Sequence, residues 1–169
     1  MQFKSFYEEI LMKILVMSDT HGNISGMEKA LKKFGSNADI IVHCGDGTRG
    51  EAMWLRDNIT HAAVVCVRGN CDFMGMMKDI EFLDICSHRI MITHGHLFGA
   101  KYGLEQLSYK AEEEGADMVF FGHTHICADE TIGGVRLINP GSCGRWEPTC
   151  AVVELDDNGN VLVNHVKVK

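Results

Sequence analysis

The sequence contains no long hydrophobic run. No apolar stretch approaches the ~18 residues that a membrane-spanning helix needs, so we expect no membrane association. The first eleven residues carry three charges and no small-residue cleavage site, which argues against a signal peptide.

An excess of positive charge is also missing. The formal net charge is -7, whereas a protein that binds extended nucleic acid or an anionic membrane presents a basic face. We therefore expect neither partner. A substrate that carries phosphate is still compatible with this charge, because bound cations can dominate the field inside a site.

Paired cysteines are absent as well. The seven cysteines are odd in number and form no Cys-x-x-Cys motif, which argues against a disulfide framework and favours a reducing, cytoplasmic location. Four of them lie in apolar segments and are expected to be small core residues: Cys44, Cys66, Cys86 and Cys150.

The length of 169 residues fits one domain. Because Met12-Lys13-Ile14 resembles the natural start of a fold, we assign residues 1–12 to an N-terminal extension and 13–169 to the domain. The first half alternates strands and helices. The expected segments are strands at 13–17, 39–44 and 63–67, and helices at 25–34 and 51–58.

The second half is richer in strands. It is expected to contain a hairpin (80–85 and 89–93), a helix (103–114), a strand (117–121) and then four short strands. Gly133-Gly134 and Asn158-Gly159 are hairpin turn signals, and 139–142 is expected to be a loop. This order of elements predicts two stacked sheets with helices outside them.

Polar side chains that can bind metal follow five of the expected strands. Because the carboxyl ends of strands are where open α/β sheets form ligand sites, these side chains can converge on one point. They are Asp19, His21, Asp46, Asn70, His94, His123 and His125. Imidazole, carboxylate and carbonyl donors together suit Mn, Zn, Fe or Ni better than Ca.

Spacing adds to this interpretation. Asp19-x-His21 and His123-x-His125 each skip one residue, so each pair could point to one side of an extended chain. Taken singly, such pairs are more often ordinary surface or core residues, and Asp46 or Asn70 could be a turn residue. The ordered set, each member after its own strand, favours a metal site.

The remaining histidines separate into two kinds. His43 lies within an expected buried strand, and His61, His88 and His165 fall at loops or strand edges, so we expect structural roles for them. His96 shares the loop of His94, and whether it touches substrate stays open at this point.

The motifs together resemble the calcineurin-like metallophosphoesterase superfamily. They are Asp19-x-His21, Gly45-Asp46, Gly69-Asn70-x-Asp72, His94 and Gly122-His123-x-His125. The chain is similar to the small YfcE-type phosphodiesterase branch of this superfamily in its short length and in three stretches of sequence. These are Arg-Gly-Asn-Cys-Asp, the Thr-His-Gly-His loop and Asn139-Pro140-Gly141-Ser142. The resemblance runs from Lys13 almost to the C-terminus.

The resemblance implies a fold and a division of the ligands. The fold is an α/β four-layer αββα sandwich of two mixed β-sheets flanked by helices. One metal would be held by Asp19, His21, Asp46 and His125, and the other by Asp46, Asn70, His94 and His123, with Asp46 bridging. The expected catalytic residues are Asp46, Asn70, Asp72 and His96. Cys71 occupies the position where larger phosphatases carry a histidine that acts as general acid.

We therefore expect a phosphodiesterase with two divalent ions, foremost Mn, with Ni, Fe, Zn or Mg as alternatives. A bridging hydroxide would attack phosphorus in line. The expected partner is a small phosphodiester, with nucleotide-derived diesters as one class, and homo-oligomers are compatible with the sequence. Two alternatives stay open: a protein-binding scaffold, because a retromer subunit resembles this fold, and a hydrolase of another bond, such as a metallo-amidase.

Overall fold

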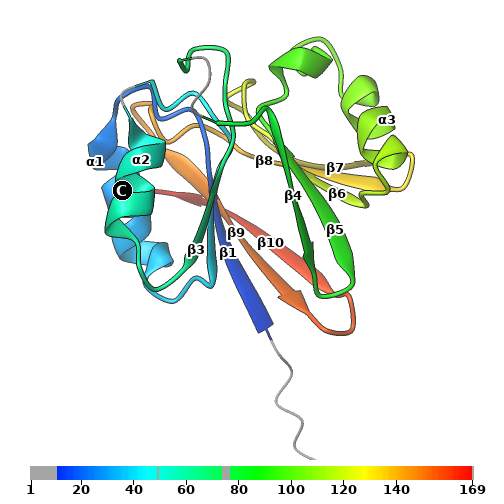
Figure 1. The fold of residues 1–169 in the computed structure, drawn as a ribbon, viewed down its shortest axis with the longest axis horizontal. Coiled ribbons are helices and arrows are strands. Elements are labelled where there is room, and N and C mark those ends of the chain that lie inside the picture. Colours follow the sequence, from blue (N-terminus) through cyan, green and yellow to red (C-terminus); the bar gives the residue numbers. More distant parts are fainter. Residues whose placement is uncertain (1–10, 49, 74–76, 169) are drawn as a thin grey trace, which may run out of the picture.

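The computed structural model describes residues 11–48, 50–73 and 77–168. Two five-stranded sheets lie face to face, with two helices outside one sheet and a third helix outside the other (Figure 1). This confirms the expected four-layer sandwich. Most of the expected N-terminal extension lies outside the described residues.

The first sheet has the order β10-β9-β1-β2-β3. The three strands β1, β2 and β3 are parallel, whereas β9 runs antiparallel to β1 and β10 antiparallel to β9. Their bounds are β1 Leu11–Met17, β2 Ile40–His43, β3 Ala63–Cys66, β9 Thr149–Asp156 and β10 Val161–Lys167.

The second sheet has the order β4-β5-β6-β8-β7. Its three central strands β5, β6 and β8 are parallel, and both edge strands, β4 and β7, are antiparallel to their neighbours. The bounds are β4 Ile80–Ile85, β5 His88–Thr93, β6 Met118–Phe120, β7 Cys127–Ile132 and β8 Val135–Pro140.

The helices cover the outer faces. Helices α1 (Ile24–Ala30) and α2 (Glu51–Asn58) lie against the first sheet, and α3 (Glu105–Glu113) lies against the second (Figure 1). A π-helical turn, η1 (Leu31–Gly35), continues α1, and a short 3-10 turn, η2 (His96–Phe98), follows β5. No helix in the described ranges is long and apolar enough to cross a membrane.

Alternating side chains explain why the central strands are apolar throughout. In β1, Ile14 and Val16 pack in the core between the sheets, whereas Leu15 and Met17 pack under α1 and α2. A strand that is covered on both faces buries both sets of side chains and therefore reads as a continuous apolar run.

Several sequence predictions need correction. Strand β1 begins at Leu11 rather than at residue 13, because Leu11 and Met12 pair with Asp156 and Leu155 of β9. The expected helix 25–34 is α-helical only to Ala30. The expected loop 139–142 begins inside β8, which extends to Pro140.

The cysteine prediction is correct for three residues and wrong for one. Cys44, Cys66 and Cys150 are buried in the core, but Cys86 is only half-buried. It lies with Ser87 in the two-residue turn between β4 and β5, and both residues have positive φ (46° and 64°), as hairpin turns of this length require. Cys143 is a further buried cysteine.

Candidate metal centre

The expected ligands occupy the loops that follow β1, β2, β3, β5 and β6. Backbone hydrogen bonds join these loops: Asp19 N–H donates to Gly45 O at 3.0 Å, His21 N–H to Asp46 O at 3.0 Å, and Gly122 N–H to His94 O at 3.2 Å. The last of these crosses from one strand of the second sheet to the next. The loops therefore form one connected platform at the edge where the parallel strands end.

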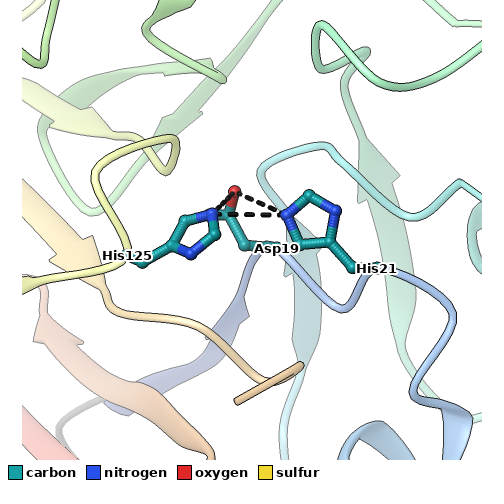
Figure 2. Close-up of side chains that lie close together, drawn as sticks. All are labelled: Asp19, His21 and His125. Atoms are coloured by element: carbon teal, nitrogen blue, oxygen red, sulfur yellow. Dashed lines mark hydrogen bonds and ion pairs between the residues drawn. The ribbon is translucent and has the colours of Figure 1, made fainter.

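The first group of side chains is Asp19, His21 and His125 (Figure 2). Asp19 Oδ1 lies 3.1 Å from His125 Nε2 and 3.8 Å from His21 Nε2. The two imidazole nitrogens are 3.3 Å apart, and Figure 2 shows the two rings reaching the Asp19 carboxylate from opposite sides. Three donor atoms therefore surround one point.

The second group is Asp19, Asp46 and His94. His94 Nε2 lies 3.3 Å from Asp46 Oδ2 and 3.9 Å from Asp19 Oδ1. Asp46 Oδ2 is also 3.7 Å from His21 Nε2. The Asp46 carboxylate thus lies between a histidine of the first group and a histidine of the second, which is where a bridging ligand must lie.

These separations suit coordination by small divalent ions. With metal–ligand bonds of about 2.0–2.2 Å, neighbouring ligand atoms are roughly 2.8–3.6 Å apart, the shorter separations in octahedral and the longer in tetrahedral geometry. The distances of 3.1 and 3.3 Å fall in that range, and those near 3.8 Å need only small side-chain rotations.

Hydrogen bonding orients the ring of His94. Its Nδ1 donates to the Cys44 carbonyl oxygen at 2.7 Å, so that Nε2 faces the two carboxylates. Both His94 Nε2 and Asp19 Oδ1 are buried and lack a hydrogen bond within the described part of the chain. Buried acceptors that face one another are unfavourable unless a cation or proton lies between them, so the residues fit a bound metal.

The other oxygen of Asp19 is held firmly. Asp19 Oδ2 accepts hydrogen bonds from the Ser18 hydroxyl at 2.6 Å and from the His123 backbone N–H at 3.0 Å. A Cβ at Gly122 would meet Ser18 Oγ at 2.0 Å, so only glycine allows this approach. The free oxygen, Oδ1, is consequently aimed into the site.

Backbone strain is concentrated at the expected ligands. Five of them have φ in the left-handed region: Asp19 (53°), His21 (45°), Asp46 (58°), His123 (67°) and His125 (61°). Non-glycine residues rarely adopt this conformation, and such strain clusters at functional sites. The expectation from alternation was wrong for His123 and His125, because the loop is not extended.

His123 and His125 instead serve different neighbours. His125 lies with His21, with ring centroids 5.1 Å apart, whereas the His123 ring is 5.0 Å from His94 and 6.1 Å from His96. Burial, with the nearby His94 and Lys101, lowers the pKa of His123 to about 4. Burial likewise lowers the pKa of His125, so both imidazoles are neutral and can donate a lone pair near pH 7.

His96 lies on η2 at the margin of the second group, with its ring 5.3 Å from that of His94. Its Nδ1 is buried and lacks a hydrogen bond among the described residues. Burial and the positive neighbours His94 and Arg68 lower the pKa of His96. The sequence left open whether His96 touches substrate. The structure places His96 as a neutral imidazole at the border of the cluster.

Asn70 and Cys71 lie beside Asp46. The Cys71 backbone N–H donates to Asp46 Oδ1 at 2.8 Å, and the Asn70 side-chain amide donates to Cys71 Sγ at 3.2 Å. Cys71 Sγ also falls into a possible ligand group with His21 and Asp46. The Cys71 thiol therefore lies close to two expected ligands, which the motif alone did not indicate.

Asp72 binds backbone rather than pointing into the cluster. Its carboxylate accepts hydrogen bonds at 2.8 Å from the N–H groups of Asp46, Thr48 and Gly69. These three bonds tie the loop after β2 to the loop after β3. In this structure Asp72, expected to be catalytic, positions the loop that carries Asp46.

Two supporting residues, Glu51 and Ser142, were missed at the sequence level. Glu51, at the start of α2, is buried and accepts hydrogen bonds from Gly22 N–H at 2.7 Å and Thr20 Oγ1 at 3.2 Å. Ser142 donates from its hydroxyl to the Asp19 carbonyl at 2.8 Å. The only sequence signal for these residues is a polar side chain in a segment that has no metal-binding motif.

Each histidine that was expected to have a structural role makes hydrogen bonds within the fold. His43 is buried, and its ring contacts the Thr20 hydroxyl and the Gly45 N–H. His61 bonds to the Gly35 carbonyl, His88 to Asp117 and the Gly159 carbonyl, and His165 to the Asn139 carbonyl.

Comparison with known sequences gives a consistent family. Residues 12–158 match the Calcineurin-like phosphoesterase superfamily domain. The chain is 40% identical over 134 residues to the probable metallophosphoesterase YsnB of Bacillus subtilis, covering 78% of this chain and 75% of that protein. It is 30% identical over 153 residues to the phosphodiesterase YfcE of Escherichia coli, covering 78% and 79%.

Solved structures share the fold. A predicted phosphoesterase from Streptococcus pneumoniae superposes with a TM-score of 0.74 at 26% identity, covering 94% of this chain and 98% of that one. Vps29 from Entamoeba histolytica, in complex with zinc, superposes with a TM-score of 0.71 at 22% identity, covering 94% and 100%. The second likeness shows the fold alone.

Proposed function

Because the chain belongs to the calcineurin-like phosphoesterase superfamily, we propose that it is a phosphodiesterase that uses two divalent metal ions. The observation that carries the proposal is the arrangement of acceptors around Asp19 and Asp46. Two carboxylates and three imidazoles converge, and two of their buried atoms lack a hydrogen bond in the described part of the chain.

The two groups of side chains supply the proposed ligand sets. Asp19, His21 and His125 would hold one ion, and His94 with His123 and Asn70 would hold the other, with Asp46 between them. When bound, such a pair of ions activates a water for attack on phosphorus and neutralises charge on the phosphoryl oxygens. Among the metals compatible with imidazole and carboxylate donors, we favour Mn.

The residues around this centre hold the ligands in place. The Cys44 carbonyl fixes the ring of His94, and Ser18 with the His123 N–H fixes the carboxylate of Asp19. Burial alone would raise the pKa of Asp46, but His94 and the Cys71 N–H keep it well below its usual range. Asp46 therefore stays ionised, as a bridging ligand must.

The preference for diesters follows from what lies near the leaving group. Cys71 stands where a histidine would protonate an alkoxide, and its pKa is raised, first by burial and then by Asp46. His96, the remaining donor at the margin, has a lowered pKa and is a poor acid near pH 7. We therefore propose that the enzyme favours esters whose leaving group needs little protonation.

The test is turnover of bis-p-nitrophenyl phosphate by purified, Mn-loaded protein. Asp46→Asn should abolish it, whereas Asp57→Asn, at an exposed carboxylate on α2, should leave it intact. A protein that binds Mn yet cleaves no phosphate ester would instead favour the scaffold alternative. Only the shared fold supports that alternative.

A further inference from the structure

A groove of about 440 Å³ opens beside the metal centre, between α1 and the loop that joins β8 to β9. The side chains that matter here are Asn23, Lys29, Arg145, Trp146, Glu147 and Lys167. Its volume is within the range of small-molecule sites, about 300–1,000 Å³. None of these residues has a role in the centre described above.

Both walls of the groove are joined to expected metal ligands. On one wall, Gly144 N–H donates to the Asp19 carbonyl at 3.0 Å, directly before Arg145. On the other, Asn23 follows His21 by two residues, and its N–H donates to the Thr20 carbonyl at 2.8 Å. The Asn23 amide also reaches the Gly144 carbonyl at 3.5 Å. The groove is therefore tied to the loop that carries Asp19 and His21.

The groove carries positive charge in a protein whose net charge is -7. Lys29, Arg145 and Lys167 line it against one acid, Glu147, which is paired with Lys167 at 2.7 Å. Arg145 directly follows Gly144, whose N–H donates to the Asp19 carbonyl, so the backbone places Arg145 beside the loop of the expected ligands.

Trp146 is the second unusual feature. Its side chain lines the groove and is 99% exposed, although a large aromatic side chain normally buries most of its surface. A flat indole beside a cationic groove suits a planar aromatic group attached to a phosphate. Nucleobases are such groups, and stacking on tryptophan is tolerant of base identity.

We propose that this groove is a binding site for the nucleoside monophosphate part of a nucleotide-derived phosphodiester, with the base on Trp146 and Arg145 on the phosphate side. The inference deepens the proposed function and rests on it. It names the substrate class: a diester in which one ester group is a nucleoside.

The kinetic test compares two diesters with the same leaving group. These are thymidine 5′-(p-nitrophenyl phosphate) and methyl p-nitrophenyl phosphate, assayed with Mn-loaded protein. The wild type should prefer the nucleoside ester in kcat/KM. Trp146→Ala should reduce that preference about 10-fold, mainly through KM, as loss of a stacked base predicts. Trp146→Phe should largely keep it, and Tyr109→Ala, at an exposed aromatic on α3, should leave it unchanged.

A binding test separates this inference from the proposed activity. The chain has two tryptophans, so Trp54→Phe leaves Trp146 as the only indole fluorophore. Saturable quenching by AMP, weakened by Arg145→Ala, supports the site even if no ester is hydrolysed. No preference between the two diesters, with no quenching by AMP, overturns the inference while the phosphodiesterase function stands. Inorganic phosphate that competes as well as AMP overturns the assignment of the base to Trp146.

Discussion

At the scale of single residues, the centre depends on groups held in conformations that they would otherwise avoid. Left-handed φ at Asp19, His21, Asp46, His123 and His125 costs on the order of 1–3 kcal/mol at each residue. The loops are fixed by backbone hydrogen bonds such as that from His21 N–H to the Asp46 carbonyl. We interpret this strain as the cost of bringing these five expected ligands close together.

Asp46 is the residue whose loss should affect both ions. Asp46→Asn keeps the size of the side chain but removes the charge between His21 and His94. We expect Mn affinity to fall at least about 100-fold at both sites, whereas His21→Ala should weaken chiefly one. Isothermal titration with Mn measures this, and an Asp46→Asn protein that retains one site at full affinity would contradict the bridging role.

Cys71 tests the argument about the leaving group. Cys71→His should raise activity on an alkyl phosphomonoester at least several-fold, since a positioned imidazole is a better acid near pH 7. Cys71→Ala should leave cleavage of bis-p-nitrophenyl phosphate largely intact. The comparison is kcat/KM for both substrates on all three proteins with the same metal.

The outcome for Cys71→Ala is decisive because Cys71 Sγ lies in one group with His21 and Asp46. If this variant loses diester cleavage while metal stays bound, Cys71 is catalytic and our account of the leaving group fails. If it loses metal instead, the thiol is a ligand.

At the scale of elements, the sequence predicts those whose local pattern and tertiary environment agree. The apolar run Ile14–Met17 is buried on both faces, and α2 has the predicted bounds. Strand ends were less predictable, because pairing with β9 extends β1 to Leu11. Loop conformation was not predictable at all, since the left-handed turns at His123 and His125 depend on hydrogen bonds from distant segments.

The same distinction applies to the site. Its expected ligands could be named because they follow the ends of five strands, which is a local signal. Glu51 and Asp72 could not be assigned as supports, because their partners, Gly22 and Thr48, lie 29 and 24 residues away. A buried carboxylate that binds backbone N–H groups has no periodic signature.

Glu51 allows a test of how α2 supports the centre. Glu51→Ala removes the acceptor for Gly22 N–H and Thr20 Oγ1, which should loosen the loop of Asp19 and His21 and lower Mn affinity about 10-fold. Glu51→Gln keeps a carbonyl oxygen and should lose much less. Glu28→Ala, at an exposed position on α1, is the matched control, and equal Mn affinity in all four proteins would contradict this role.

At the scale of the whole molecule, every expected ligand follows the first strand that the structure describes. No expected ligand precedes Asp19, and β1 begins at Leu11. We predict that deleting residues 1–10 leaves kcat/KM unchanged. Deleting residues 1–12 also removes the pairs of Leu11 with Asp156 and of Met12 with Leu155, and should lower Tm by at least about 2–4 °C.

Calorimetry and the diester assay on the two truncated proteins distinguish these effects. Loss of turnover on removal of residues 1–10 alone, at unchanged solubility, would show that the prediction is wrong and that this segment contributes to activity or assembly. The structure does not test the cytoplasmic location or the formation of a homo-oligomer, and both stay predictions.

The central claim is that Asp46 joins two groups of ligands into one centre for two ions. Elemental analysis of the purified, Mn-saturated protein, with turnover of bis-p-nitrophenyl phosphate followed as ions are added, tests it most directly. We predict two Mn ions per chain, with full activity only when both are bound. A single ion per chain at saturating Mn, with full activity, would contradict the account.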